Sequence, residues 1–146
     1  MNEIEKIAMD GICKIVGEPF MFGMKFSDTD LYIFGFGEPK ENARLNCEYR
    51  IHLLCSFKIV WRNPKRESEI FYSDSSEIEF DLAFERLKGR RVRNVQFLGK
   101  VNDLVIDLGD CYILIYTVDS DEESYRYFRL NSDEPHIVVS YNWIDI

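Results

Sequence analysis

The stretch that decides the fold is YRIHLLCSFKIVW, residues 49–61. Its odd-numbered positions from residue 51 to residue 61 are all apolar, whereas the even-numbered positions are mixed. Successive side chains of a β-strand point to opposite faces, so this alternation predicts a long strand packed on its odd-numbered face. Six consecutive odd-numbered positions that are all apolar favour a place for this strand at the centre of a sheet. Asn63-Pro64 is expected to end the strand.

Shorter segments with the same alternation lie on both sides of this stretch, and turn residues separate them. The first two predict a hairpin, and the three between residues 92 and 118 predict an antiparallel meander. The expected strands are residues 20–26, 31–36, 69–72, 92–98, 103–108, 112–118, 125–130 and 136–141.

Two segments have helical spacing instead. The N-terminal segment places apolar residues three and four apart, and Gly17 and Pro19 end it. A second, short helix is expected over residues 78–88, with Gly89 at its C-cap. The apolar positions of the two segments are Ile4, Ile7, Ala8, Ile12 and Ile15, and Phe80, Ala83, Phe84 and Leu87. The sequence therefore predicts an α+β fold, predominantly antiparallel β. An N-terminal amphipathic helix and one short helix pack on a β meander, as a partly open barrel or sandwich.

Length and charge limit the function classes. The chain has 146 residues without an internal repeat or linker, which predicts a single domain over residues 1–146. Its 26 acidic and 18 basic residues give a formal net charge of −8, which disfavours binding to nucleic acid or anionic membranes. No apolar run has the length of a membrane span, and residues 1–6 lack the features of a signal peptide. We expect a cytoplasmic protein.

No motif for catalysis or metal binding is apparent. The four cysteines include no CxxC pair, and three lie in apolar stretches where cysteine acts as a small buried hydrophobe: Cys13, Cys55 and Cys111. His52 and Cys55 lie three residues apart on an expected strand, so they point to opposite faces and cannot form a catalytic dyad. We expect no enzymatic activity, no catalytic residues, no cofactor and no metal.

Two groups of carboxylates stand out. Neither group has the ligand spacing and central glycine of an EF-hand loop, although calcium binding and plain solvated surface remain alternatives. Because an acidic surface attracts basic proteins, these residues are our candidates for partner contacts. They are Asp74, Glu77, Glu79 and Asp81 in the first group, and Asp119, Asp121, Glu122 and Glu123 in the second.

Three short segments resemble a pattern found in small bacterial proteins of toxin–immunity loci, including contact-dependent inhibition systems. The segments are residues 51–59 (IHLLCSFKI), 127–130 (YFRL) and 133–139 (DEPHIVV). The pattern has Arg where this chain has Lys58, and Trp where it has Phe128. The resemblance implies an immunity protein that neutralises a cognate toxin by occlusion, and the charge of this chain favours a basic toxin such as a nuclease.

Two other hypotheses remain open. One is a small-ligand-binding or enzymatic β-domain with a pocket between sheet and helix, lined by aromatic residues such as Phe22, Tyr32 and Phe57. The other is an oligomeric adaptor that pairs an exposed strand edge with another chain. The sequence does not determine the oligomeric state.

Overall fold

The decisive stretch forms two strands in the computed structural model, which describes residues 1–26, 29–39, 47–62 and 69–146. Strand β3 (Tyr49–Leu53) lies in one sheet and β4 (Phe57–Trp61) in another, so the single long strand that we predicted is wrong. Between them the Leu54 N–H donates to the carbonyl of Ser124, and the Ser56 carbonyl accepts from the Tyr116 N–H. These bonds to distant segments hold the bend. The odd-numbered side chains from Ile51 to Trp61 are all buried, as expected.

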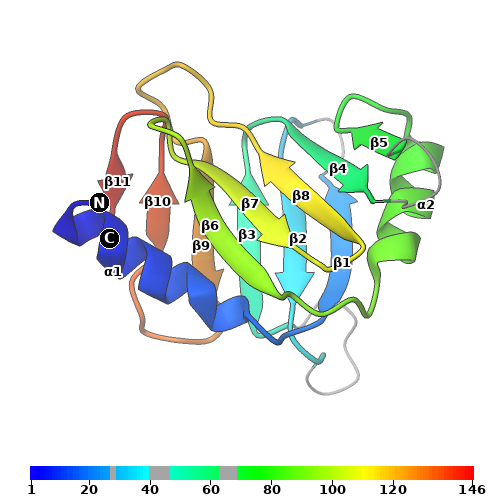
Figure 1. Cartoon of the computed structure of the whole chain (residues 1–146), viewed down its shortest axis with the longest axis horizontal. Helices are drawn as coiled ribbons and strands as arrows, with labels where there is room; N and C mark the ends of the chain where they lie inside the picture. Colours follow the sequence, from blue (N-terminus) through cyan, green and yellow to red (C-terminus); the bar gives the residue numbers. More distant parts are fainter. Residues whose placement is uncertain (27–28, 40–46, 63–68) are drawn as a thin grey trace.

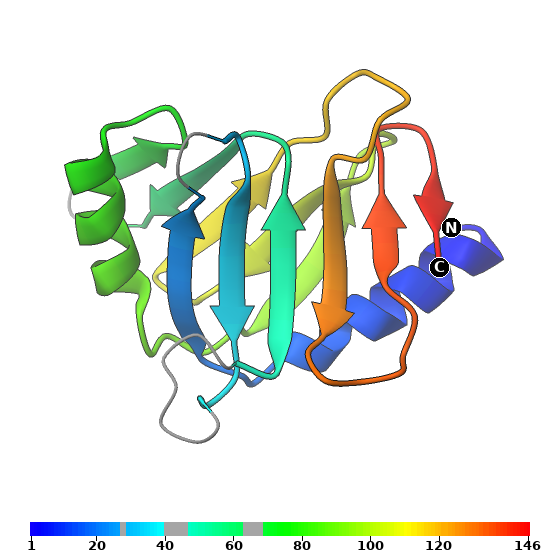
Figure 2. The same ribbon diagram turned by 180° about the vertical axis from the view of Figure 1, so that it is seen from behind.

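The described residues contain two α-helices and eleven strands. The strands form two antiparallel sheets, in the orders β1-β2-β3-β9-β10-β11 and β5-β4-β8-β7-β6 (Figures 1 and 2). The remaining bounds are α1 Glu3–Ile12, β1 Phe20–Lys25, β2 Tyr32–Phe36, β5 Glu69–Tyr72, α2 Glu77–Leu87, β6 Asn94–Leu98, β7 Asp103–Asp107, β8 Cys111–Ile115, β9 Tyr125–Arg129, β10 Ile137–Val139 and β11 Ile144–Asp145, with a 3-10 turn over Cys13–Ile15 after α1.

Most of the expected elements are present. β1 and β2 form the predicted hairpin, and β6, β7 and β8 form the predicted meander. The last strands are shorter than expected, and the two-residue strand β11 was missed. The breaks expected at Ser27-Asp28 and Asn63-Pro64 lie outside the described residues.

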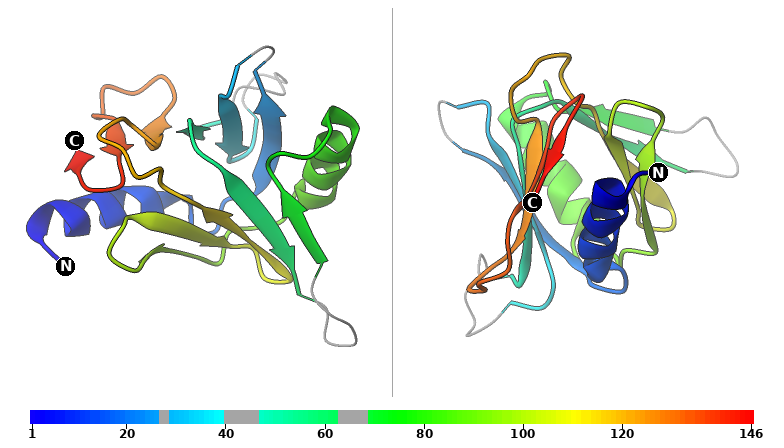
Figure 3. Two further views of the ribbon diagram at one scale, coloured as in Figure 1. Left: turned by 90° about the horizontal axis from the view of Figure 1, so that it is seen from above. Right: turned by 90° about the vertical axis from the view of Figure 1, so that its left-hand side faces the viewer.

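Each helix closes one open side between the two sheets (Figure 3). α1 begins with a capping box between Asn2 and Glu5 and buries Ala8 and Ile12 against β6, β10 and β11. α2 lies at the opposite side, between the edge strands β1 and β5. No helix in the described part of the chain is long and apolar enough to cross a membrane. The α+β, mostly antiparallel fold with two packed helices is confirmed as a partly open sandwich.

Aromatic rings fill the space beneath α2. Phe57 of β4 lies at the centre, with ring centroids 5.0 Å from Phe34 and 6.2 Å from Phe84 of α2. Phe84 also stacks on Phe20 of β1, and Phe80 packs edge-on against Phe71 of β5. Edge-to-face and offset pairs of this kind add stability beyond the area that they bury. They join both sheets to the helix.

Removal of the Phe84 ring is expected to lower the stability of the fold strongly. Phe84→Ala will lower the free energy of unfolding by about 3–5 kcal/mol, since the cavity opens between two sheets that cannot easily collapse. Leu82→Ala, on the exposed side of the same helix, will change it by less than about 0.5 kcal/mol. Urea denaturation followed by circular dichroism measures both values. Equal losses in the two variants would contradict this assignment of the helix faces.

Candidate protein-docking site

The outward side of α2 differs from the rest of the surface, and we call it the α2 face. It comprises the apolar side chains of Ile78 and Leu82 and the carboxylates of the same segment: Asp74, Glu77, Glu79, Asp81 and Glu85. The helix begins at an N-cap formed by Ser76, whose hydroxyl accepts from the Glu79 N–H. Its inner side is the apolar row that the sequence predicted, and the remaining positions of the helix face outward.

Two aliphatic side chains protrude from this face. Ile78 is 74% exposed, the highest value for a large apolar side chain among the described residues, and Leu82 is 68% exposed. They lie four residues apart, which places them on the same side of the helix. Sequence reasoning missed them as candidates. The signal was present, because both fall outside the apolar row that packs on the core.

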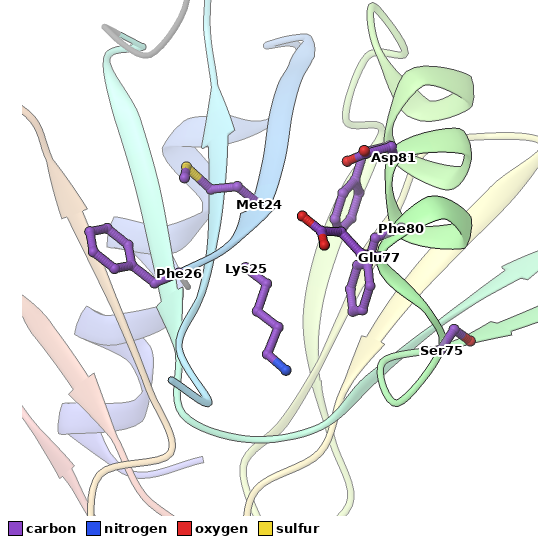
Figure 4. A pocket seen from close by; sticks show the side chains of 8 residues that line it. Met24, Lys25, Phe26, Ser75, Glu77, Phe80 and Asp81 are labelled. Atoms are coloured by element: carbon purple, nitrogen blue, oxygen red, sulfur yellow. The ribbon is translucent and has the colours of Figure 1, made fainter. Parts of the chain in front are cut away.

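A groove runs along the side of α2 that faces β1 (Figure 4). Its wider part has a volume of about 520 Å³, and a narrower part of about 210 Å³ continues from it, with Asp81 and Phe84 common to both. The Glu77 carboxylate points into the wider part, opposite Lys25. The lining residues are Met24, Lys25, Phe26, Ser75, Glu77, Phe80, Asp81 and Phe84 in the wider part, and Met21, Phe22, Gly23, Asp81, Phe84, Glu85 and Lys88 in the narrower.

A second crevice, of about 410 Å³, lies on the other side of α2, against the edge strand β5. Trp61 forms part of its wall, and the Arg86 guanidinium lies 3.7 Å from the centroid of the indole. Arg86 also donates to Glu69 of β5 at 3.1 Å, which ties the helix to that strand. The α2 face is therefore bounded on both sides by a hollow and by the outermost strand of a sheet.

The five carboxylates of the α2 face outnumber the two basic side chains that line the groove beside them, Lys25 and Lys88. None of the five forms an ion pair with another described residue. All five residues are exposed. Their potential is therefore directed outward, where an incoming basic group can meet it.

The second acidic group lies elsewhere and is partly engaged. Asp121 accepts a hydrogen bond from Trp143 Nε1 through its carbonyl and one from Asn142 Nδ2 through its carboxylate. Glu123 forms an ion pair with Arg126. The loop that holds these residues joins β8 to β9 and is well separated from α2 in Figure 1 and in the left view of Figure 3. The structure does not bring the two acidic groups together.

The cysteines and histidines do not converge on a reaction centre. Burial raises the pKa of both Cys55 and Cys111 to about 12, so these thiols stay protonated. His52 and His136 lie on the outer face of the six-stranded sheet, on either side of the Phe128 ring at centroid distances of 4.8 and 4.5 Å. Among the described residues no group of three His, Cys, Asp or Glu side chains is placed to hold a metal ion.

A pocket between sheet and helix is present, but its aromatic lining differs from the one considered from sequence. Tyr32 and Phe57 contact each other inside the core, with ring centroids 5.1 Å apart. Phe22 belongs to a separate apolar cluster with Ile33 and Cys47, and it also lines the narrower part of the groove. The wider part of the groove is bounded by Phe26, Phe80 and Phe84 instead.

Comparison with protein-family models, with curated proteins and with solved structures gives no match. The α2 face therefore has to be interpreted from its own geometry and charge.

His52 makes stability depend on pH. Burial, and then the charges of Arg50 and Arg126, lower its pKa from the ordinary value of 6.5. As the pH is lowered, His52 therefore takes up a proton in the unfolded chain before it does so in the folded chain. The contribution of His52 to the free energy of unfolding is fully present above about pH 6.5 and decreases as the pH falls below that value. We expect the urea midpoint to fall between pH 7.5 and pH 5, and to fall less in His52→Gln. An identical decrease in both proteins would exclude His52 as the cause.

Proposed function

We propose that this protein is a non-catalytic binding module that holds a basic protein partner on the α2 face. The observation that carries the proposal is the coincidence at one place of exposed aliphatic side chains and unpaired carboxylates. Exposed apolar groups at the centre of a charged surface are typical of protein interfaces, in which a desolvated core is surrounded by a polar rim. On α2, Ile78 and Leu82 supply the core and the carboxylates supply the rim.

The two kinds of group contribute differently. Removing the protruding side chains from water stabilises a complex by about 1.5–3 kcal/mol for each side chain that becomes fully buried. The carboxylates act mainly on the encounter, because complementary charge steers association and increases its rate. The formal net charge of −8 extends this attraction beyond the contact itself.

We further propose that the partner is a basic toxin and that the chain is its immunity protein, acting in the cytoplasm. The support is the resemblance of residues 51–59, 127–130 and 133–139 to proteins of toxin–immunity loci. An inhibitor of this kind needs only to cover the active surface of its target, so matching shape and potential are sufficient. A toxin that acts on nucleic acid has a basic surface, which the α2 face would complement.

The apolar side chains of α2 provide the direct test. When the chain is co-expressed with the product of the adjacent gene, the two proteins will co-elute in size-exclusion chromatography. Ile78→Ser combined with Leu82→Ser will release the partner, because the polar side chains cannot form the apolar core. Ile4→Ser combined with Ile7→Ser is the matched control, since these isoleucines are each 50% exposed on α1. Loss of the complex in the control, or retention in both, would contradict the proposal.

The carboxylates are tested through association kinetics. Neutralising Glu77, Asp81 and Glu85 with Gln, Asn and Gln will lower the association rate constant about ten-fold or more at low ionic strength, and high salt will remove the difference. The control neutralises three exposed carboxylates away from α2, by Asp119→Asn, Glu122→Gln and Asp133→Asn. Stopped-flow fluorescence with the adjacent-gene product measures the rates. Equal slowing in both variants would show that net charge, and not the α2 face, steers the encounter.

A further inference from the structure

The outer edge of β1 is an open strand edge inside the groove. β1 pairs with β2 on one side only, and the Phe26 N–H donates to the Leu31 carbonyl at the end of that ladder. Backbone groups alternate in direction along an antiparallel strand. Met24 and Phe22 therefore direct their N–H and C=O groups toward β2, in register with Ile33 and Gly35, whereas Gly23 and Lys25 direct theirs away from it.

The outward groups of Gly23 and Lys25 have no backbone partner among the described residues. Further down the same edge, a register shift between Phe20 and Phe22 reverses the alternation. The outward groups of Phe20 are paired there, because its N–H donates to the Arg90 carbonyl and its carbonyl accepts from the Gly89 N–H. The chain that follows α2 thus already acts as a short antiparallel neighbour of β1. The edge accepts an extended segment at one end and is open at the other.

α2 lies alongside the open part of this edge and runs in the opposite direction to β1. Glu77 and Phe80 of the first helical turn line the groove with Met24 and Phe26, and the last turn lines it near Met21. The close approach depends on Gly23, since a Cβ atom there would lie 2.6 Å from the Phe84 ring. One wall of the groove is therefore free backbone, and the other is a helix.

The helix wall carries carboxylates at a regular interval. Glu77, Asp81 and Glu85 are each four residues apart and all line the groove, so they form one row with a rise of about 6 Å per step. Alternate side chains of an extended strand are about 6.6–6.8 Å apart on one face. Lys25 and Lys88 also line the groove, but neither forms an ion pair with these carboxylates in the described part of the chain.

We propose that an extended segment of the basic partner adds as a strand to the open edge of β1, beside α2. Its backbone pairs with the outward groups of Gly23 and Lys25. Lys or Arg side chains at alternate positions meet the carboxylate row on α2. Strand addition gives affinity through the backbone and specificity through alternate side chains. This inference rests on the proposed function and identifies the part of the partner that the α2 face recognises.

The test uses two synthetic peptides of equal composition, Lys-Thr-Lys-Thr-Lys and Lys-Lys-Lys-Thr-Thr, both with blocked ends. Titration into ¹⁵N-labelled protein gives the dissociation constants from amide chemical shifts. We expect at least ten-fold tighter binding of the alternating peptide, with the largest shifts at the Gly23 and Lys25 amides. Equal affinity for the two isomers, or no binding of either, would overturn the proposal.

A pair of protein variants separates backbone pairing from charge attraction. Lys25→Pro removes an outward N–H without touching the ladder to β2, and proline is tolerated at such edge positions. Lys25→Thr removes the same side chain but keeps the N–H. Both variants are checked for native circular dichroism. The alternating peptide should bind Lys25→Pro at least ten-fold more weakly than Lys25→Thr, and equal binding would overturn strand addition.

Failure of strand addition can be distinguished from failure of the proposed function. The proposed function depends on the complex with the adjacent-gene product and on its loss when Ile78 and Leu82 are changed to serine. If that complex behaves as expected while the peptides bind without regard to lysine spacing, strand addition alone is wrong. If the adjacent-gene product does not bind at all, the proposed function fails first.

Discussion

The contact on which the rest of the structure depends is the insertion of the phenylalanines of α2 between the two sheets. Phe84 packs on Phe20, Phe34 and Phe57, which come from both sheets, and Phe80 packs on Tyr32 and Phe71. Without these rings, the side of the sandwich between β1 and β5 would expose the core. Because the inner side of the helix is fixed by this contact, its outer side is fixed too, and the carboxylates and aliphatic residues of the α2 face stand at defined positions between two sheet edges.

Local periodicity predicted much of this fold. It failed where contacts with distant segments determine the path of the chain. The odd-even pattern of residues 49–61 identified the buried face, and helical spacing identified both helices. The bend at Leu54–Ser56 could not be predicted in this way, because alternation continues through it and its hydrogen bonds come from Tyr116 and Ser124. Strand β11 has only two residues, too few for a periodic signal.

The candidate site was visible in the sequence only in part. The acidic residues of α2 were apparent, but so was the group at residues 119–123, and local sequence could not show that Asp121 is engaged by Asn142 and Trp143. The groove has no local signature at all, since it depends on the position of β1 beside a helix more than fifty residues away in the chain. The exposed pair Ile78 and Leu82 could have been found, because both fall outside the apolar row that packs on the core and lie four residues apart, on one side of the helix.

The most direct measurement is hydrogen–deuterium exchange of the chain, alone and bound to the adjacent-gene product. Contact at the α2 face predicts slower amide exchange over β1 and α2 in the complex, with little change in β6, in β7 and in the loop that holds Asp119 and Glu123. Slower exchange confined to that loop or to the outer faces of the sheets, with α2 unchanged, would contradict this placement of the docking site.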